Sequence, residues 1–289
     1  MENSDFKTPV LLIAFNRPET TARVFDIIRK VRPRELFFAL DGSRDNRPDD
    51  KERIAQTQAL IKQIDWPSEV QTLFQEKNLG SGLGPVTAIN WFFETVSEGI
   101  ILEDDCIPDP SFFYFCQELL DYYRDSEKVM HISGDNFQNG KKRGDASYYF
   151  SKYTHNWGWA TWRRAWKHND FEMLPPEARR HIWDKQWLKS VERQGGLAIL
   201  PNVNLVTNIG SGEGATHTSQ EANPYLHLLS QSMTFPLVHP KTIHRDVWAD
   251  LYTYRTLFEG TLSALALQKM LHAIPSGPKK IVKRALGVK

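Results

Sequence analysis

Three adjacent acids, Glu103, Asp104 and Asp105, directly follow the apolar run 99–102. Neighbouring carboxylates repel one another, and a cation between them relieves that cost. Residues i and i+2 of an extended segment point the same way, so Glu103 and Asp105 could share one site. Carboxylate oxygens suit Mg²⁺ or Mn²⁺ better than Zn²⁺. The triplet therefore predicts a divalent-cation site, and an acidic turn ahead of a helix starting at Asp109 is the simpler alternative.

Two further charged residues also follow apolar runs. Arg17 comes just after the run 9–15, and Asp41 closes the run 36–40. If these runs are parallel strands of one sheet, their carboxyl ends meet at the edge where open α/β sheets bind ligands. We therefore expect Arg17, Asp41 and the acidic triplet to face one crevice.

Two glycine-rich segments are candidates for contact with a ligand there. Gly80-Ser-Gly-Leu-Gly84 lacks the Gly-Lys-Ser/Thr ending of a phosphate-binding P-loop. We interpret it as a helix-initiating turn that either touches the ligand or serves the helix alone. The segment Gly210–His217 has three glycines in its first five residues. It suits a loop that orders over a ligand, with backbone N–H groups and Thr216 facing phosphate oxygens, or else a flexible connection.

Six of the nine tryptophans lie between positions 157 and 187. Aromatic faces stack on sugar rings, and polar groups beside them fix the orientation of the ring. Pairs of tryptophans four residues apart are equally typical of packing on one face of a helix. We expect two or three of the six to contact a sugar, with Trp157, Trp159 and Trp183 as the candidates.

The elements that position these residues follow from the order of the apolar runs. Continuous apolar runs are typical of buried parallel strands, and residues at i, i+3, i+4 and i+7 indicate helices between them. This alternation predicts an α/β fold with a Rossmann-like, mainly parallel sheet and helices on both faces. The expected strands are 9–15, 36–40, 70–74, 99–102 and 129–133, and the expected helices are 18–31, 49–64, 85–96 and one starting at 109.

Beyond residue 145 the pattern becomes irregular and aromatic. A helix near 176–193, a strand near 198–207 and one or two helices within 244–272 are predicted. We expect one catalytic domain over residues 1–220 and a C-terminal helical extension over 221–289 packed on it.

Composition excludes several classes of protein. A net charge of +1 argues against a nucleic-acid-binding protein, and 40% hydrophobic residues argue against disorder. Two cysteines favour a reducing compartment, and the first residues do not form a signal peptide. We expect a cytoplasmic protein. Its basic segment 279–289 either contacts the inner face of a membrane or is a solvated tail.

Seven stretches occur together, in the same order, in one known family of enzymes. The set resembles glycosyltransferases of the GT-A fold, and most closely the N-acetylglucosaminyltransferase I type. It covers roughly residues 8–220, and the acidic triplet followed by a proline and a Phe-rich helix is its most specific part. The stretches are Thr8–Pro18, Leu40–Gly42, Ile100–Phe115, Ile132–Asn136, Trp157–Trp159, Ile182–Trp187 and Gly210–His217.

The resemblance implies a site for a nucleotide-diphosphate-sugar donor. Arg17 and Asp41 would hold the nucleoside, and Glu103 and Asp104 would contact the ribose or the sugar. Asp105 would be the protein's ligand to a Mn²⁺ or Mg²⁺ ion on the diphosphate.

The resemblance also implies a catalytic base and a loop over the donor. Asp184 would match the base, and Thr216 and His217 would lie on the loop that orders over the diphosphate. The family has two Asp between the tryptophans that flank its base, whereas this chain has three residues there. Asp135 and Asp170 are therefore alternatives for the base.

These features predict a metal-dependent, inverting glycosyltransferase. It would move a hexosyl or N-acetylhexosaminyl group from a nucleotide sugar to a hydroxyl of a glycan or lipid-linked acceptor, as in polysaccharide biosynthesis. A sugar nucleotidyltransferase is one alternative, although such enzymes have a Gly-rich loop where this chain reads Phe15–Glu19. A non-catalytic carbohydrate-binding protein is the other.

Overall fold

The computed structural model describes residues 6–179, 181–210, 225–226 and 228–258. Tertiary contacts divide the chain into two units, Met1–Asp246 and Val247–Lys289. The second unit contributes α8 (Val247–Thr253) and a π-helical turn, η3 (Tyr254–Phe258). The predicted boundary of a catalytic domain near residue 220 stays a prediction. In the described ranges, no helix is both long enough and apolar enough to cross a membrane.

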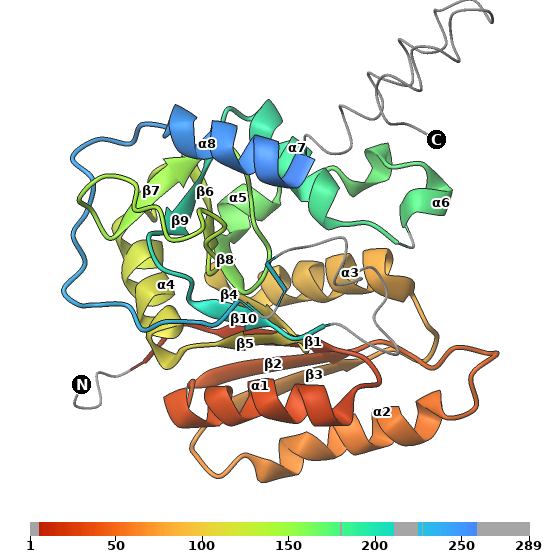
Figure 1. The fold of residues 1–289 in the computed structure, drawn as a ribbon. Coiled ribbons are helices and arrows are strands. Elements are labelled where there is room, and N and C mark those ends of the chain that lie inside the picture. The colour runs from red at the N-terminus through yellow and green to blue at the C-terminus, as the bar shows by residue number, and fades with distance from the viewer. Residues whose placement is uncertain (1–5, 180, 211–224, 227, 259–289) are drawn as a thin grey trace, which may run out of the picture. The chain divides into compact units, whose positions relative to one another are not determined.

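The first unit combines strands and helices (Figure 1). Its strands are β1 (Val10–Ala14), β2 (Glu35–Leu40), β3 (Glu69–Phe74), β4 (Glu98–Glu103), β5 (Cys106–Pro108), β6 (Val129–Ser133), β7 (Tyr148–Ser151), β8 (Trp159–Trp162), β9 (Leu197–Pro201) and β10 (Val206–Asn208). Its helices are α1 (Pro18–Val31), α2 (Asp50–Gln58), η1 (Ala59–Gln63), α3 (Gly80–Thr95), α4 (Pro110–Tyr122), α5 (Arg163–Trp166), η2 (Phe171–Met173), α6 (Pro176–Arg179) and α7 (Asp184–Arg193).

Eight of these strands form one sheet in the order β3-β2-β1-β4-β8-β6-β9-β7. The first four pair in parallel. β8 runs antiparallel to β4 and β6, and β7 runs antiparallel to β9. The remaining pair, β6 and β9, is parallel, so six of the eight strands share one direction. The predicted mainly parallel α/β sheet is therefore confirmed.

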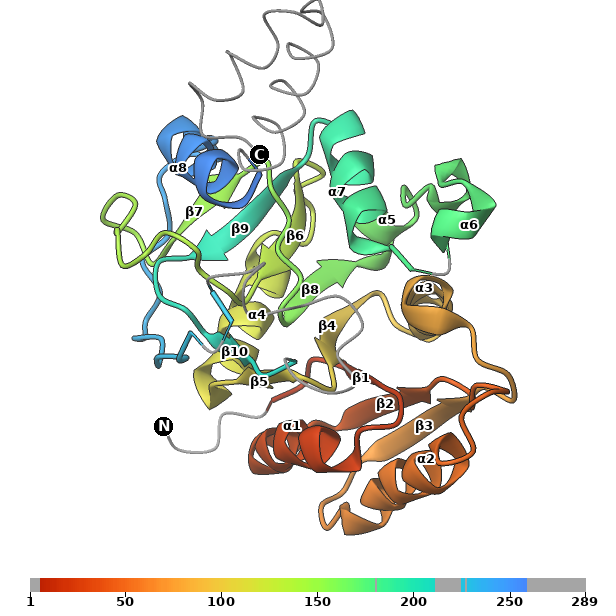
Figure 2. The same cartoon turned by 45° about the vertical axis from the view of Figure 1, so that its right-hand side comes forward.

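Successive residues of each strand pack against different helices, because side chains alternate between the two faces of a sheet. Val10 and Leu12 belong to one core with residues of α1 and α4. Leu11, between them, belongs to a second core with residues of α3, α5 and α7. Figure 2 shows α3, α5 and α7 on the side of the sheet away from α1. Helices on both faces are thus confirmed.

The later part of the first unit differs in detail from the predicted elements. The predicted helix 176–193 is two helices, α6 and α7, and the predicted strand 198–207 is two strands, β9 and β10. The strands β7 and β8 were not predicted. Every residue of both is buried, so neither strand shows the polar–apolar alternation that marks a half-exposed strand.

A buried histidine lies within the second core. The indole of Trp187 donates a hydrogen bond to Nδ1 of His131 (3.0 Å), and Nε2 of His131 donates to the carbonyl of His155 (2.8 Å). The ring of Trp159 stacks on the imidazole at 5.0 Å. Burial lowers the pKa of His131 to about 3. The imidazole is therefore neutral in the folded protein, with its proton on Nε2.

This histidine predicts a loss of stability in mild acid. Below the ordinary pKa of about 6.5, the unfolded chain binds a proton that the folded chain excludes, so stability falls as the pH falls toward 3. Between pH 7 and 5, we expect the wild type to lose about 2 kcal/mol more unfolding free energy than His131→Asn. Urea denaturation at both pH values measures the difference. Equal losses would contradict this account of His131.

Candidate functional site

Several polar side chains meet at the edge of the sheet where β1, β2 and β4 end. A cavity of about 300 Å³ lies there. Arg17, Asp41, Glu103 and Asp104 all line it, so these four residues do face one crevice. Asp105, the fifth residue expected there, does not line this cavity but contacts Arg17, which does.

Arg17 is directed at the acidic triplet. Its guanidinium forms a two-pronged hydrogen bond with the Asp104 carboxylate, and its Nη2 lies 3.1 Å from Oδ2 of Asp105. The backbone N–H of Phe15 donates to the same Asp104 carboxylate (3.3 Å). Asp104 is buried, and a buried charge is stable when it is paired and hydrogen-bonded. Arg17 and Asp104 therefore hold the end of β1 against the end of β4.

The triplet still carries more negative charge than Arg17 neutralises. Burial raises the pKa of Glu103 above its ordinary value. The charges of Asp105 and Asp104 add to that shift, and so does the charge of Asp184. Asp184 is the first residue of α7 and is exposed. The structure thus brings the predicted base, Asp184, within electrostatic range of the triplet.

Asp105 lies against the start of the glycine-rich segment. β10 pairs with β5 in an antiparallel ladder, and the N–H of Ile209 donates to the carbonyl of Asp105 (2.9 Å). A Cβ atom on Gly210 would overlap Oδ2 of Asp105, so a side chain at position 210 would displace the Asp105 carboxylate. Thr216 and His217, further along the segment, lie outside the described residues.

Asp41 is occupied by the protein itself. Its carboxylate accepts hydrogen bonds from the N–H groups of Gly42, Leu79 and Gly80 and from Nδ2 of Asn78, all at 2.8–2.9 Å. These donors account for the roughly four acceptor positions of a carboxylate. Asp41 therefore anchors the turn that begins α3, and the glycine-rich stretch at 80–84 is the first turn of that helix, as interpreted from the sequence.

Replacing Asp41 should consequently destabilise the protein even without ligand. Asp41→Ala leaves the N–H groups of Leu79 and Gly80 without their acceptor, and we expect a loss of about 2 kcal/mol in unfolding free energy. Asp45, exposed in the following loop, provides the control, because Asp45→Ala should change stability by less than about 0.5 kcal/mol. Chemical denaturation compares the two. If Asp41→Ala has the same unfolding free energy as the wild type, the Asp41 carboxylate is not needed to anchor α3 and would be available to a ligand.

Asp135, an alternative base, is paired in the interior. Its Oδ1 lies 2.6 Å from Nδ1 of His155, and its Oδ2 accepts from the N–H of Trp157 (3.2 Å). Asp135 has no exposed surface. It therefore positions the connection between β7 and β8. Asp170, the other alternative, is half exposed and lies 3.9 Å from Arg193.

The tryptophan cluster is mainly core. Trp159 has no exposed surface and Trp183 is 6% exposed, and both pack with Trp187 in the second core. Neither ring has a face free to stack on a sugar in this arrangement, so Trp159 and Trp183 serve packing here. Trp157 is half-buried, with Phe137 at its edge (4.8 Å between ring centroids). It is the candidate that keeps accessible surface.

Some residues that line the cavity were not predicted from the sequence. They are Asn78, which follows β3, Arg44, which lies beyond β2, and His181, which lies just before α7. Asn78 and Arg44 follow strands that end at this edge, and that position is the signal that could have identified them. His181 comes from the irregular region, where no strand marked its place.

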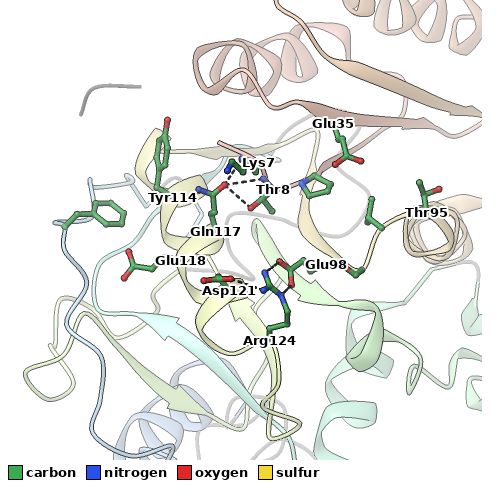
Figure 3. A pocket seen from close by; sticks show the side chains of 14 residues that line it. Lys7, Thr8, Glu35, Thr95, Glu98, Tyr114, Gln117, Glu118, Asp121 and Arg124 are labelled. Carbon is green, nitrogen blue, oxygen red and sulfur yellow. Dashed lines mark hydrogen bonds and ion pairs between the residues drawn. The ribbon is translucent and has the colours of Figure 1, made fainter. Parts of the chain in front are cut away.

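A larger hollow of about 960 Å³ lies at the opposite edge, where β1, β2 and β4 begin. Figure 3 shows that two groups of its polar side chains interact among themselves. Oε1 of Gln117 accepts from the N–H groups of Lys7 and Thr8, and Arg124 pairs with Glu98 and Asp121. These pairs are structural, and the cavity at the carboxyl edge is the better candidate for chemistry.

A divalent cation fits the chemistry of the carboxyl edge. In the described part of the chain, there is no group of three or more His, Cys, Asp or Glu side chains that could bind a metal ion by itself. Mg²⁺ sites, however, commonly use one or two carboxylates together with substrate phosphates. The Asp105 side chain keeps 16% of its surface exposed, beside two carboxylates and one arginine. Asp105 is therefore the residue best placed to bind a cation.

Comparisons with known proteins give fold-level similarity. No protein-family model and no curated protein matches the chain. Solved structures that resemble it include a UDP-glucose pyrophosphorylase complexed with UDP-glucose (8% identity, TM-score 0.39, 67% of this chain and 90% of that chain). Mouse xyloside xylosyltransferase 1 is another (14%, 0.37, 66% and 83%). A third is 4-diphosphocytidyl-2C-methyl-D-erythritol synthase from Anaerococcus prevotii (10%, 0.40, 74% and 94%). Similarities this distant assign no activity to the chain.

Proposed function

We propose that the protein is a metal-dependent, inverting glycosyltransferase that uses a nucleotide-diphosphate sugar. The observation that supports this most is the convergence at one sheet edge of a cavity, the acidic triplet and the exposed carboxylate of Asp184. These are the parts that the reaction requires: a place for a nucleotide, a place for a cation and a base.

The donor would lie along the edge of the sheet. The cavity beside β1 and β2 would take the nucleoside, and the diphosphate would extend toward Asp105. Arg17 holds Asp104 and reaches Asp105, so it fixes the position of the carboxylate that would bind the cation. When bound, Mn²⁺ or Mg²⁺ would stabilise the negative charge that develops on the diphosphate leaving group.

Asp184 would take the proton from the acceptor hydroxyl. Asp184 is the first residue of α7, and the helix dipole favours a negative charge at that end of a helix. Proton removal by a positioned base contributes about 10²–10⁴ in rate. A base opposite the leaving group gives a single displacement, and hence inversion at the sugar carbon.

The acceptor would approach past Trp157, whose half-buried ring lies beside Phe137. A glycan or lipid-linked hydroxyl fits such a surface, because aromatic rings stack on the apolar faces of sugars. The basic segment 279–289, outside the described residues, is our candidate for contact with an anionic membrane surface.

A thermal-shift panel tests donor binding. Nucleotide sugars with different bases and sugars are each measured with and without Mn²⁺. A donor at 100 times its Kd should stabilise the protein by about 2.7 kcal/mol. We expect at least one donor to raise the Tm more strongly with Mn²⁺ than without it. A flat response to every nucleotide sugar would contradict the proposal.

A further inference from the structure

Arg44 is held rigidly at the cavity although it lies in an exposed loop. Its Nε and Nη2 donate to the carboxylate of Asp50 (2.7 and 2.8 Å), and its backbone N–H donates to the same group (3.0 Å). Asn16 donates to Asp50 as well (2.7 Å). Asp50 is buried, so one edge of the guanidinium is fixed in the protein.

The ion pair with Asp50 also neutralises the charge of Arg44. Hydrogen bonds from Arg44 lower the pKa of Asp50 to about 2, so the carboxylate is ionised at neutral pH. A guanidinium whose charge is balanced at 2.7 Å attracts a diphosphate weakly. Arg44 therefore offers the cavity a planar group rather than a net positive charge.

The guanidinium also lies over an aromatic ring. Its central carbon is 5.2 Å from the ring centroid of Phe15, and both residues line the cavity. Across the described residues, no hydrogen bond to Nη1 of Arg44 is present, so this nitrogen and the side turned from Phe15 remain for a ligand. The cavity is lined by small apolar residues such as Ala39 and Ala88, which suit a flat, weakly polar group.

We propose that Arg44, held by Asp50 and supported by Phe15, forms a stacking platform for the nucleobase of the donor. The proposal rests on the proposed function, because it assumes that a nucleotide occupies the cavity. It assigns Arg44 to the base and leaves the diphosphate to Asp105 and its cation. Guanidinium groups stack on flat aromatic rings, whereas the ammonium of lysine provides a point charge.

Two substitutions separate stacking from charge. Arg44→Lys keeps a positive charge beside Asp50 but removes the planar guanidinium. Arg44→Gln places a planar, uncharged amide there. Arg47→Ala is the control, because Arg47 belongs to the same loop and does not line the cavity. Isothermal titration with UDP, dTDP, CDP, GDP and ADP in the presence of Mn²⁺ identifies the tightest nucleotide. Each variant is then titrated with that nucleotide and with inorganic pyrophosphate, after its Tm confirms folding.

Stacking predicts that Arg44→Lys weakens nucleotide binding about 10-fold and leaves pyrophosphate binding unchanged. Arg44→Gln should bind the nucleotide more tightly than Arg44→Lys, and Arg47→Ala should match the wild type. If Arg44→Lys binds the nucleotide like the wild type, or if pyrophosphate binding falls in parallel, the platform is wrong while the proposed function stands. If the wild type binds none of the five nucleotides, both proposals fail.

Discussion

Asp105→Asn is expected to lower sugar transfer about 10³-fold, because it removes the negative ligand of the proposed cation. The asparagine keeps the shape of the side chain and an oxygen for the Nη2 of Arg17, so the contact between β1 and β4 should persist. The loss should therefore appear in kcat at saturating Mn²⁺ and in the Mn²⁺ concentration needed for half-maximal activity, with little change in Tm.

Asp45→Asn is the matched control for this substitution. Asp45 is an exposed acid of the loop after β2 and does not line the cavity, so its variant should retain full activity. An Asp105→Asn enzyme that transfers sugar at the wild-type rate would rule out Asp105 as the ligand of an essential cation.

Asp184→Asn is expected to lower kcat by about 10²–10⁴, because an amide cannot accept the proton of the acceptor hydroxyl. Asp184 lies near the triplet without pairing to it, so the Kd of the donor should change little. Steady-state kinetics and donor titration on the same variant separate the two effects. Raising the pH should restore part of the rate as hydroxide replaces the missing base.

Glu192→Gln, near the opposite end of α7, provides the control for helix integrity. Its carboxylate is exposed and lies 3.8 Å from Lys152, so little stability depends on it. If Asp184→Asn keeps its kcat, the base lies elsewhere. Asp135→Asn would not identify that base by itself, because it also breaks the contact with His155.

The sequence predicted the parallel half of the sheet well, because that half depends on local patterns. Runs such as 36–40 are buried on both faces and are therefore continuously apolar. In the helix between the first two strands, the apolar residues recur with the 3.6-residue period of an α-helix. Arg17, Asp41 and the triplet reach one edge as a consequence of parallel pairing. The strand β8 was missed because it enters the middle of the sheet antiparallel, between β4 and β6. Such long-range pairing leaves no local pattern.

The roles of individual side chains depended on partners that spacing does not reveal. Asp41 follows a strand as a ligand-binding acid would, yet its carboxylate is occupied by the start of α3. Trp159 fits a sugar site by type, yet it has no exposed surface. Arg44 belongs to no recognisable motif, because its orientation depends on Asp50, six residues later at the start of α2. The sequence therefore predicted which edge of the sheet gathers the polar side chains. It did not predict which atoms of those side chains remain available to a ligand.

Cleavage of the bond between the sugar and the diphosphate tests the central claim most directly. The purified protein is incubated with Mn²⁺ and the donor that gives the largest thermal shift, and the products are followed by ³¹P NMR. With no acceptor added, water takes the sugar in place of the acceptor hydroxyl, so we predict release of the free sugar and the nucleoside diphosphate. This release should stop when Mn²⁺ is chelated and be lost in Asp105→Asn. Formation of a nucleoside triphosphate and a sugar 1-phosphate when pyrophosphate is added would instead identify a nucleotidyltransferase, and no turnover of any bound donor would contradict catalysis at this site.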